Sequence, residues 1–360
     1  MAKAIALLSG GLDSSLAVLT LLAQGVEVTA VTFLTHFGCD ITDRSSCSKD
    51  PFEAAQKFGF QVKLCHLADK FIEIVKNPKH GHGKNMNPCI DCRILMLREA
   101  RSLMELTGAD FLVTGEVLGQ RPMSQRRETF PVIDREAGVV GLVLRPLSAK
   151  LFKPTQAEVS GLVDREKLHA FSGRTRKPQI ALARELGLTD YPAPAGGCLL
   201  TDPIYSYRLK DLLAHDPDPS VKDITLLKYG RHFRHSPRCR IIVGRHKGDN
   251  EAIESLVSPS DTTLRAPDTG SPITLIAGAA DDAAVFAAAS LTARYCDKKR
   301  EKFVTVNVFR GLDAHVCDIV AIPSDDFTLD AMRIVEKSAP KIYIPKKYRR
   351  DILEVAVGVS

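Results

Sequence analysis

The sequence predicts an α/β protein in which a parallel-sheet domain is followed by a second, smaller α/β domain. Over residues 1 to about 150, short apolar runs of strand length alternate with longer periodic runs, the rhythm of βαβ units with helices on both faces of a parallel sheet. A polar, proline-containing segment at 215–220 has the composition of a domain linker. Beyond it, strand-like runs flank an alanine-rich helix, which predicts the second unit.

The elements of the first half follow from their periodicity. Apolar runs of four to eight residues predict buried strands at 4–8, 26–33, 61–67 and 111–115. Apolar residues recurring at helical spacing predict helices at 16–22, 51–58 and 92–106. Residues 156–188 change character and predict two helices joined by a loop at Ser172 and Gly173. Residues 191–198 contain prolines and glycines and predict a rigid, non-helical stretch.

In the second half, strands are expected at 240–243, 273–276 and 303–309, and a helix at 279–292. We therefore expect three parts: a larger α/β domain at 1–214, a smaller domain at 221–315, and a basic extension at 316–360.

Composition favours a water-soluble protein. Hydrophobic residues make up 44% of the chain and the mean hydropathy is −0.05. No stretch approaches the roughly 20 apolar residues that a membrane helix needs. The N-terminus opens directly into a strand-like run without the pattern of a signal peptide. A cytoplasmic location with no membrane partner is the expectation.

The formal net charge is +6, and several basic clusters lie in the second half. Clustered positive charge suits a polyanion such as RNA. Arg231, Arg234 and Arg245 are the candidate RNA-binding residues, because they lie near glycines and a predicted strand end where the backbone can approach RNA. Short basic runs are also common on ordinary solvated surfaces, and the charge pattern alone leaves that alternative open.

The nine cysteines of a cytoplasmic chain favour metal or redox chemistry over a disulfide framework. Cys89 and Cys92 form a C-x-x-C pair at the start of a predicted helix, where the helix dipole lowers a thiol pKa. One pair cannot close a four-ligand site. Cys198, which follows two glycines, is the third candidate, although a plain tight turn also explains that sequence. Cys65 lies in a strand-like run and is expected in the core.

The loop at 9–15 is the strongest functional feature. It lies between a predicted strand and a predicted helix, an arrangement that directs backbone N–H groups and a helix N-terminus at an anion. Its glycines allow close approach of a phosphate, and its serines add hydroxyl groups. It lacks the lysine and spacing of a Walker loop. An ordinary glycine-rich turn is the competing interpretation. The predicted ATP-binding residues here are Ser9, Gly10, Gly11, Asp13, Ser14 and Ser15.

This loop resembles the S-G-G-x-D-S motif of the PP-loop ATP pyrophosphatases, which have the adenine nucleotide alpha hydrolase-like fold. With the stretches 87–92, 114–125 and 145–147, residues 1 to about 200 resemble PP-loop tRNA thiolation enzymes, in particular the 4-thiouridine synthetase (ThiI) family. The 2-thiouridylases of the MnmA type are more distant relatives. Residues 231–234 and 243–245 resemble the RNA-binding domain of the NFACT proteins.

The resemblance implies ATP and Mg²⁺ as cofactors, with Asp13 tied to the metal and the phosphates, and it places Gly115 and Gln120 across from the phosphates. It gives Cys89, Cys92 and Cys198 one of two roles: ligands of a [4Fe–4S] cluster with one open iron, or a pair acting as persulfide and resolving thiol. Both roles stay open here. The implied partners are tRNA and a sulfur donor, either sulfide or a persulfide-carrying protein. A homodimer is left open.

The resulting functional hypothesis is ATP-dependent tRNA thiolation: a uridine carbonyl is adenylated and sulfur then replaces its oxygen. The catalytic residues would be Asp13 and the three cysteines. One alternative is a PP-loop ligase or amidase that adenylates a small molecule, and another is a non-catalytic RNA-binding protein with a vestigial nucleotide fold. Neither the target nucleotide nor the sulfur donor follows from the sequence.

Overall fold

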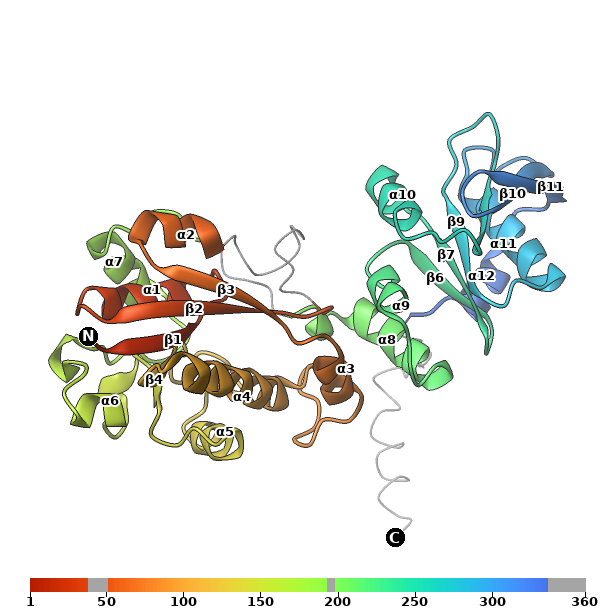
Figure 1. Ribbon diagram of the computed structural model, residues 1–360. Helices are drawn as coiled ribbons and strands as arrows, with labels where there is room; N and C mark the ends of the chain where they lie inside the picture. Colours follow the sequence, from red (N-terminus) through yellow and green to blue (C-terminus); the bar gives the residue numbers. More distant parts are fainter. Residues whose placement is uncertain (38–50, 193–197, 336–360) are drawn as a thin grey trace, which may run out of the picture.

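The computed structural model describes residues 1–37, 51–192 and 198–335 of the chain, and two β-sheets form the centres of two lobes (Figure 1). Gly196 and Gly197, the two glycines directly before Cys198, lie outside the described residues. Most of the predicted basic extension at 316–360 also lies outside them. None of the helices in the described ranges combines the length and the apolar composition that a membrane span requires.

The first sheet has five parallel strands in the order β3-β2-β1-β4-β5, which confirms the predicted parallel-sheet domain. Its strands are β1 (Lys3–Leu7), β2 (Glu27–Leu34), β3 (Gln61–His66), β4 (Phe111–Thr114) and β5 (Val143–Leu144). The short β5 was not expected from the sequence. Since all strands are parallel, their carboxyl ends lie at one edge, where ligands of such folds bind.

Alternating residues of β1 pack into two different cores. Ile5 and Leu7 belong to the cluster on the side of α3 and α4, whereas Ala4 and Ala6 belong to the cluster on the side of α1. The strand is therefore buried on both faces, as expected for a parallel sheet. The helices of this unit are α1 (Leu12–Leu22), α2 (Pro51–Phe58), α3 (Ala68–Lys76), α4 (Cys89–Thr107), α5 (Thr129–Ala137), α6 (Gln156–Val159) and α7 (Lys177–Glu185).

The two helices expected over 156–188 are much shorter than predicted. A capping box between Thr155 and Glu158 starts α6, but the helix ends after four residues. Gly161, in the left-handed region at φ +71°, turns the chain away just after it. A 3₁₀ turn at Arg165–Lys167 and a loop then lead to α7, so that the region is mostly irregular.

The second sheet has six antiparallel strands in the order β11-β10-β8-β9-β7-β6. They are β6 (Arg231–Ser236), β7 (Cys239–Val243), β8 (Thr262–Arg265), β9 (Thr274–Gly278), β10 (Val304–Arg310) and β11 (Ala314–Ala321). The helices are α10 (Lys247–Glu254), α11 (Asp282–Tyr295) and α12 (Asp326–Met332). This confirms the predicted second, smaller unit, which contains both helices and strands. Its sheet continues to Ala321, so the boundary expected after residue 315 falls inside β11.

The predicted linker at 215–220 is a loop between two packed helices, α8 (Pro203–His215) and α9 (Val221–Leu226). The Asp202 side chain caps α8 by accepting from the Tyr205 amide at 2.7 Å. Apolar side chains of both helices join the core cluster of the first lobe: Tyr205, Leu209, Leu212 and Ile224. Figure 1 shows α8 and α9 between the two sheets.

Candidate active site

The loop after β1 exposes the start of α1. Gly10 has φ +70°, a conformation that favours glycine. Gly11 is the N-cap residue of α1 and provides no side-chain hydrogen bond to the first turn. The first amides of α1 thus have no capping side chain, and together with the positive end of the helix dipole they form an anion-binding site. This is the geometry that the sequence predicted for a phosphate loop.

Ser14 stabilises the loop through side-chain hydrogen bonds. Its Oγ donates to the Gly11 carbonyl at 2.9 Å and accepts from the Ser9 amide at 3.2 Å. The Ser9 hydroxyl lies 3.2 Å from the same Oγ, on the exposed side of the loop. Ser15 is buried, and its amide donates to the Gly11 carbonyl at 3.1 Å. Ser14 therefore shapes the loop, and Ser9 is the more exposed hydroxyl.

Asp13 and Gln120 meet across the site. The Gln120 Nε2 donates to Asp13 Oδ2 at 2.8 Å, although the two residues are 107 positions apart. Asp13 Oδ1 and Gln120 Oε1 are both buried and have no hydrogen-bond partner within the described part of the chain. An orphaned carboxylate oxygen beside a phosphate-binding turn fits Mg²⁺, which binds through one or two carboxylates, substrate phosphates and waters. The carboxylate and the amide face the same small volume.

Gly115 allows the end of β4 to approach α1. A β-carbon placed on it would lie 2.5 Å from the Cα and the amide nitrogen of Ser14, both backbone atoms. Any side chain would force the loop that follows, which includes Gln120, away from the phosphate loop. The resemblance to PP-loop enzymes predicted that Gly115 lies near the nucleotide. Its close packing against the Ser14 backbone gives the physical reason for a glycine at this position.

A buried ion-pair network lies under the same loop, and the sequence analysis did not assign it a role. Glu116, 2% exposed, pairs with Arg145 Nε at 3.1 Å and with Arg93 Nε at 3.1 Å. Arg145 also bonds both carboxylate oxygens of Asp134, at 2.7 and 3.0 Å, and stacks 4.3 Å from the centre of the Phe130 ring. These contacts fix the backbone just after Gly115. No local pattern in the sequence could have found them, because they join α4, α5 and the ends of β4 and β5.

A cavity of about 120 Å³ opens beside the phosphate loop. Leu8, Phe58 and Leu188 supply apolar walls, and Gly10 lies at its rim. Lys57 is fixed at one side, since its Nζ donates to the carbonyl of Gly187 at 2.9 Å. Glu53, Lys57 and Asp190 also line the cavity. Apolar walls next to an anion site suit a ligand with a flat ring and a charged chain, such as a nucleotide.

The candidate cysteines lie in segments that converge at the carboxyl edge of the first sheet. Cys89 begins α4 and Cys92 lies in its first turn. The segment before them is joined to the segment after Cys198 by two hydrogen bonds: Met86 donates to the Leu200 carbonyl at 3.1 Å, and Asn85 Nδ2 to the Thr201 carbonyl at 2.6 Å.

Cys198 is tied to the end of β2 as well, because its Sγ lies 3.6 Å from the carbonyl oxygen of Phe37. Cys92 and Cys198 both pack against the same core cluster. Within residues 1–37, 51–192 and 198–335, no three Cys, His, Asp or Glu side chains form a group that could hold a metal ion. The iron–sulfur role of Cys89, Cys92 and Cys198 therefore stays a prediction, and we derive no step through a cluster.

Cys65 lies on β3, opposite Phe33 of β2. Burial raises the pKa of its thiol, which makes it a poor nucleophile at neutral pH. Its position in a strand and its partial burial agree with the structural role expected from the sequence.

Each of the three arginines expected to bind RNA has a partner within the protein. Arg231 stacks 4.3 Å from the centre of the Tyr295 ring and donates to the Gly244 carbonyl at 3.1 Å. Arg234 forms an ion pair with Asp211 of α8.

Arg245 forms an ion pair with the buried Asp249, Nε to Oδ2, at 2.5 Å. Its side chain is 42% exposed, so a second contact on its outer side is sterically open. The three guanidinium groups hold the start of the second lobe together, and the structure does not gather them into one free cationic surface.

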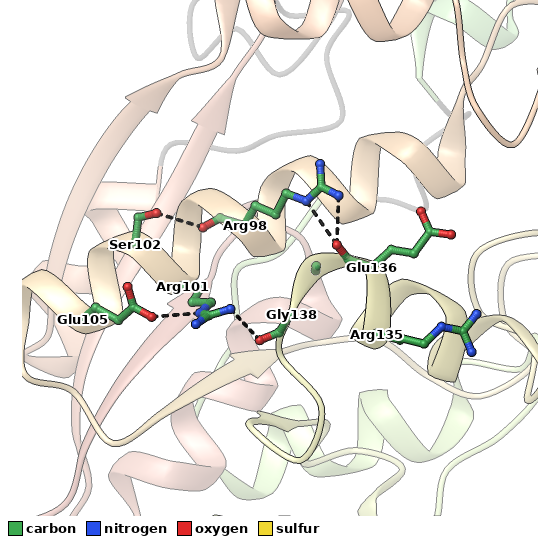
Figure 2. A pocket seen from close by; sticks show the side chains of 8 residues that line it. Arg98, Arg101, Ser102, Glu105, Arg135, Glu136 and Gly138 are labelled. Atoms are coloured by element: carbon green, nitrogen blue, oxygen red, sulfur yellow. Dashed lines mark hydrogen bonds and ion pairs between the residues drawn. The ribbon is translucent and has the colours of Figure 1, made fainter.

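A larger but shallow cavity of about 400 Å³ lies away from the phosphate loop, on the second half of α4 and the end of α5 (Figure 2). Arg98 donates twice to the Glu136 carbonyl, at 2.8 and 3.2 Å, and Arg101 donates to the Gly138 carbonyl at 2.9 Å. These carbonyls end α5, where a helix lacks internal donors. Arg98 and Arg101 therefore cap the end of α5, and we assign this cavity a structural role.

Two family models match the chain. Residues 1–150 match the family described as thiamine biosynthesis protein (ThiI), and residues 230–327 match the NFACT protein RNA binding domain. Both resemblances inferred from the sequence are thereby confirmed.

Curated relatives are tRNA-thiolating proteins by name. The chain is 29% identical over 273 residues to a tRNA-specific 2-thiouridylase MnmA of Herpetosiphon aurantiacus, covering 69% of this chain and 66% of that protein. It is 29% identical over 154 residues to a probable tRNA sulfurtransferase of Thermococcus kodakarensis, covering 40% of this chain and 36% of that protein. The chain thus spans from about a third to just under two thirds of these relatives.

Among solved structures, a 4-thiouridine synthetase–RNA complex with bound ATP is 23% identical and covers 52% of this chain and 52% of that chain, with a TM-score of 0.33.

Proposed function

We propose that this chain, in which a ThiI-type domain precedes an NFACT-type RNA-binding domain, is an ATP-dependent tRNA sulfurtransferase. The contact of Gln120 with Asp13 is the observation that supports it most directly. It joins the loop after β4 to the phosphate loop and leaves one buried carboxylate oxygen of Asp13 without a protein partner.

ATP would bind with its phosphates at the start of α1, where Gly10 and Gly11 permit close approach. Mg²⁺ bound to Asp13 would neutralise the pyrophosphate leaving group. The adenine ring fits the character of the cavity beside Leu8 and Phe58. Gln120 would then orient the Asp13 carboxylate and leave its second oxygen for the metal.

Adenylation turns the uracil carbonyl oxygen into a better leaving group. The carbonyl oxygen of uracil leaves poorly, but attack of that oxygen on the α-phosphorus of ATP releases pyrophosphate and turns it into a phosphoester. A sulfur nucleophile can then add to the ring carbon and expel AMP. The protein contributes by holding both reactants and by stabilising charge in a site that excludes water.

For sulfur transfer we propose the persulfide route, with Cys198 and either Cys92 or Cys89 as the pair. The terminal sulfur of a cysteine persulfide attacks the ring carbon, and AMP leaves, so that base and cysteine are linked by a disulfide. The thiolate of the second cysteine attacks the cysteine sulfur of that bond. The thiocarbonyl base leaves, the two cysteines become a disulfide, and an external thiol must reduce it before the next persulfide is loaded.

The convergence of the two cysteine segments supports this route. The hydrogen bonds of Met86 and Asn85 hold the segment before α4 against the segment after Cys198. Both lie at the edge of the sheet where the phosphate loop begins.

The test is a reaction of the full chain with ATP, Mg²⁺ and an unmodified tRNA transcript. We expect tRNA-dependent release of AMP and pyrophosphate, and a thiouridine in the digested tRNA by mass spectrometry when a persulfide donor is supplied. Asp13→Asn is the control, since it keeps the shape of the side chain and removes the charge. Release of ADP and phosphate, or pyrophosphate release that depends on a small acid instead of tRNA, would refute the assignment.

A further inference from the structure

One half of the second sheet has a face that no helix covers within the described residues. The α11 side of this sheet is buried, and Val304, Val306 and Val308 of β10 point into that core. On the other side, α9 and α10 contribute Leu226 and Ile253 to a core with β7 and β9. The side chains of β10 and β11 on that side are half-buried or exposed instead, whereas Thr263 of the neighbouring β8 is buried.

Alternate residues of β10 form a strip on this open face. Successive side chains in a strand point to opposite faces, so Thr305, Asn307 and Phe309 share the face opposite to the three buried valines, and Phe303 directly precedes the strand. Phe303 is 53% exposed, and Phe309 is partly exposed. The two rings are six residues apart, which in a strand corresponds to about 20 Å.

Each of the two phenylalanines has a cation over its ring. The Arg265 guanidinium lies 5.1 Å from the centre of the Phe309 ring, and the Lys302 ammonium lies 5.4 Å from that of Phe303. The Arg265 Nη2 donates to the Leu312 carbonyl at 3.1 Å, whereas its buried Nε has no hydrogen-bond partner in the described residues. Each ring therefore lies next to a positive charge and remains at least partly exposed.

Polar groups continue the strip onto β11. The ring of His315 meets Phe309 edge-on, with 5.7 Å between ring centres and an angle of 77°. His315 Nε2 lies 2.7 Å from Asp318 Oδ1, which also accepts from the Asn307 side chain. Hydrogen-bonding side chains thus lie between two exposed aromatic rings.

We propose that this strip, formed by Lys302, Phe303, Asn307, Phe309, Arg265 and His315, binds a single-stranded segment of RNA. Bases stack on exposed aromatic rings whatever their identity, and cations beside those rings neutralise the phosphates. A sheet face with this composition is a common RNA-binding platform. The inference rests on the proposed function in taking RNA as the ligand, and it assigns the contact to a surface different from Arg231, Arg234 and Arg245.

The charged side chains of the strip favour RNA over a protein as its ligand. An apolar docking face for a protein would be poor in charged groups at its centre. Here, cations accompany both aromatic rings, and the Asp318 carboxylate between them is hydrogen-bonded to Asn307 and His315. A single-stranded polyanion fits the rings and the cations beside them.

The absence of tryptophan from the chain gives a direct assay. Phe309→Trp introduces a single fluorophore into the strip of the full-length protein and keeps an aromatic ring for stacking. We expect a labelled 12-nucleotide oligo(U) to bind this variant as well as the parent and to quench its fluorescence. Phe286→Trp on α11, where the native ring is 59% exposed, is the matched control and should not be quenched.

Alanine variants measure the contribution of stacking. Phe309→Ala and Phe303→Ala should each weaken oligo(U) binding about five-fold or more, whereas Phe286→Ala should leave it unchanged. Arg265→Ala and Lys302→Ala should each lower the slope of log affinity against log salt by about 0.7, and the phenylalanine variants should leave that slope intact. Thermal unfolding of each variant checks that the sheet is folded.

The outcomes separate this inference from the proposed function. Unchanged oligo(U) binding by folded Phe309→Ala, with no quenching of Phe309→Trp, would overturn the strip as an RNA site even if the protein thiolates tRNA. A change in oligomeric state on Phe303→Ala or Phe309→Ala would assign the face to a second copy of the chain and would also overturn it. If the strip binds oligo(U) but no AMP forms with tRNA, the proposed reaction fails and the RNA site stands.

Discussion

The side-chain amide of Gln120 is hydrogen-bonded to the carboxylate of Asp13 at 2.8 Å, and this contact joins the loop after β4 to the first turn of α1. Gly115 permits that approach, and the Glu116–Arg145 ion pair fixes the backbone beside it. The candidate site is thus built from two loops at adjacent strand ends of one parallel sheet.

Asp13 and Ser14 should differ in their effects on catalysis. Asp13→Ala removes the proposed metal ligand, and we expect pyrophosphate release to fall at least about 100-fold. Ser14→Ala removes the hydrogen bonds to Gly11 and Ser9 that shape the loop, and we expect a loss of about five-fold. Steady-state pyrophosphate release at several Mg²⁺ concentrations measures both. Equal losses would contradict the assignment of the metal to Asp13.

Gly115→Ala should damage both stability and activity. Its new methyl group would lie 2.5 Å from backbone atoms of Ser14, so the two loops must separate. Gly11→Ala is the matched control for stability, because its methyl group would meet only the Ser9 hydroxyl, at 3.5 Å. Thermal unfolding should show a lower midpoint for Gly115→Ala and one near the parent for Gly11→Ala. A parent-like midpoint and parent-like activity for Gly115→Ala would show that the close approach is dispensable.

The cysteines should be required together. Serine in place of Cys198 should abolish thiolation and leave tRNA-dependent AMP release intact, because adenylation precedes sulfur transfer. Serine at Cys92 or Cys89 tests which residue is its partner. Cys65→Ser is the control and should be fully active, since burial raises its thiol pKa and its place is in a strand. Iron analysis of anaerobically purified protein separates the routes: about four irons per chain, lost in the cysteine variants, would replace the persulfide route by a cluster.

Acid should weaken the second lobe through His232. This side chain is 1% exposed, and burial, with Arg208 and Arg240 nearby, holds its pKa well below the ordinary 6.5. It stays neutral in the folded protein while the unfolded chain takes up a proton below about pH 6.5. This difference in proton uptake at His232 therefore lowers the free energy of unfolding by about 1.4 kcal/mol for each pH unit below pH 6.5.

His232→Gln should remove that part of the pH dependence, and His235→Gln, on the same strand, should not. Urea unfolding at pH 7.5, 6.5 and 5.5 provides the comparison. An identical slope of unfolding free energy against pH in His232→Gln and the parent would be evidence that another group controls the acid sensitivity.

The sequence by itself determined the local elements of the catalytic half and the chemistry of its first loop. The strand predicted at 4–8 and the helix predicted at 16–22 are found at 3–7 and 12–22. They follow from residue periodicity and, with the glycines between them, from turn chemistry, both of which act over a few neighbouring positions. The order of strands and helices along the chain was enough to predict a parallel sheet. The motif in this loop was also enough to predict a phosphate site.

Only the tertiary structure decided which distant groups meet. The partner of Asp13 is 107 residues away, and Met86 pairs with Leu200 across a similar separation. Such contacts depend on how strand ends are ordered in the sheet, which local periodicity does not specify. For the same reason Arg234, basic in the sequence, is an internal partner of Asp211, while the face of β10 that includes Phe309 became a candidate RNA surface only once the sheet was assembled. A charge or an aromatic ring is available to a ligand only where folding leaves part of it exposed, and that is decided by the tertiary structure.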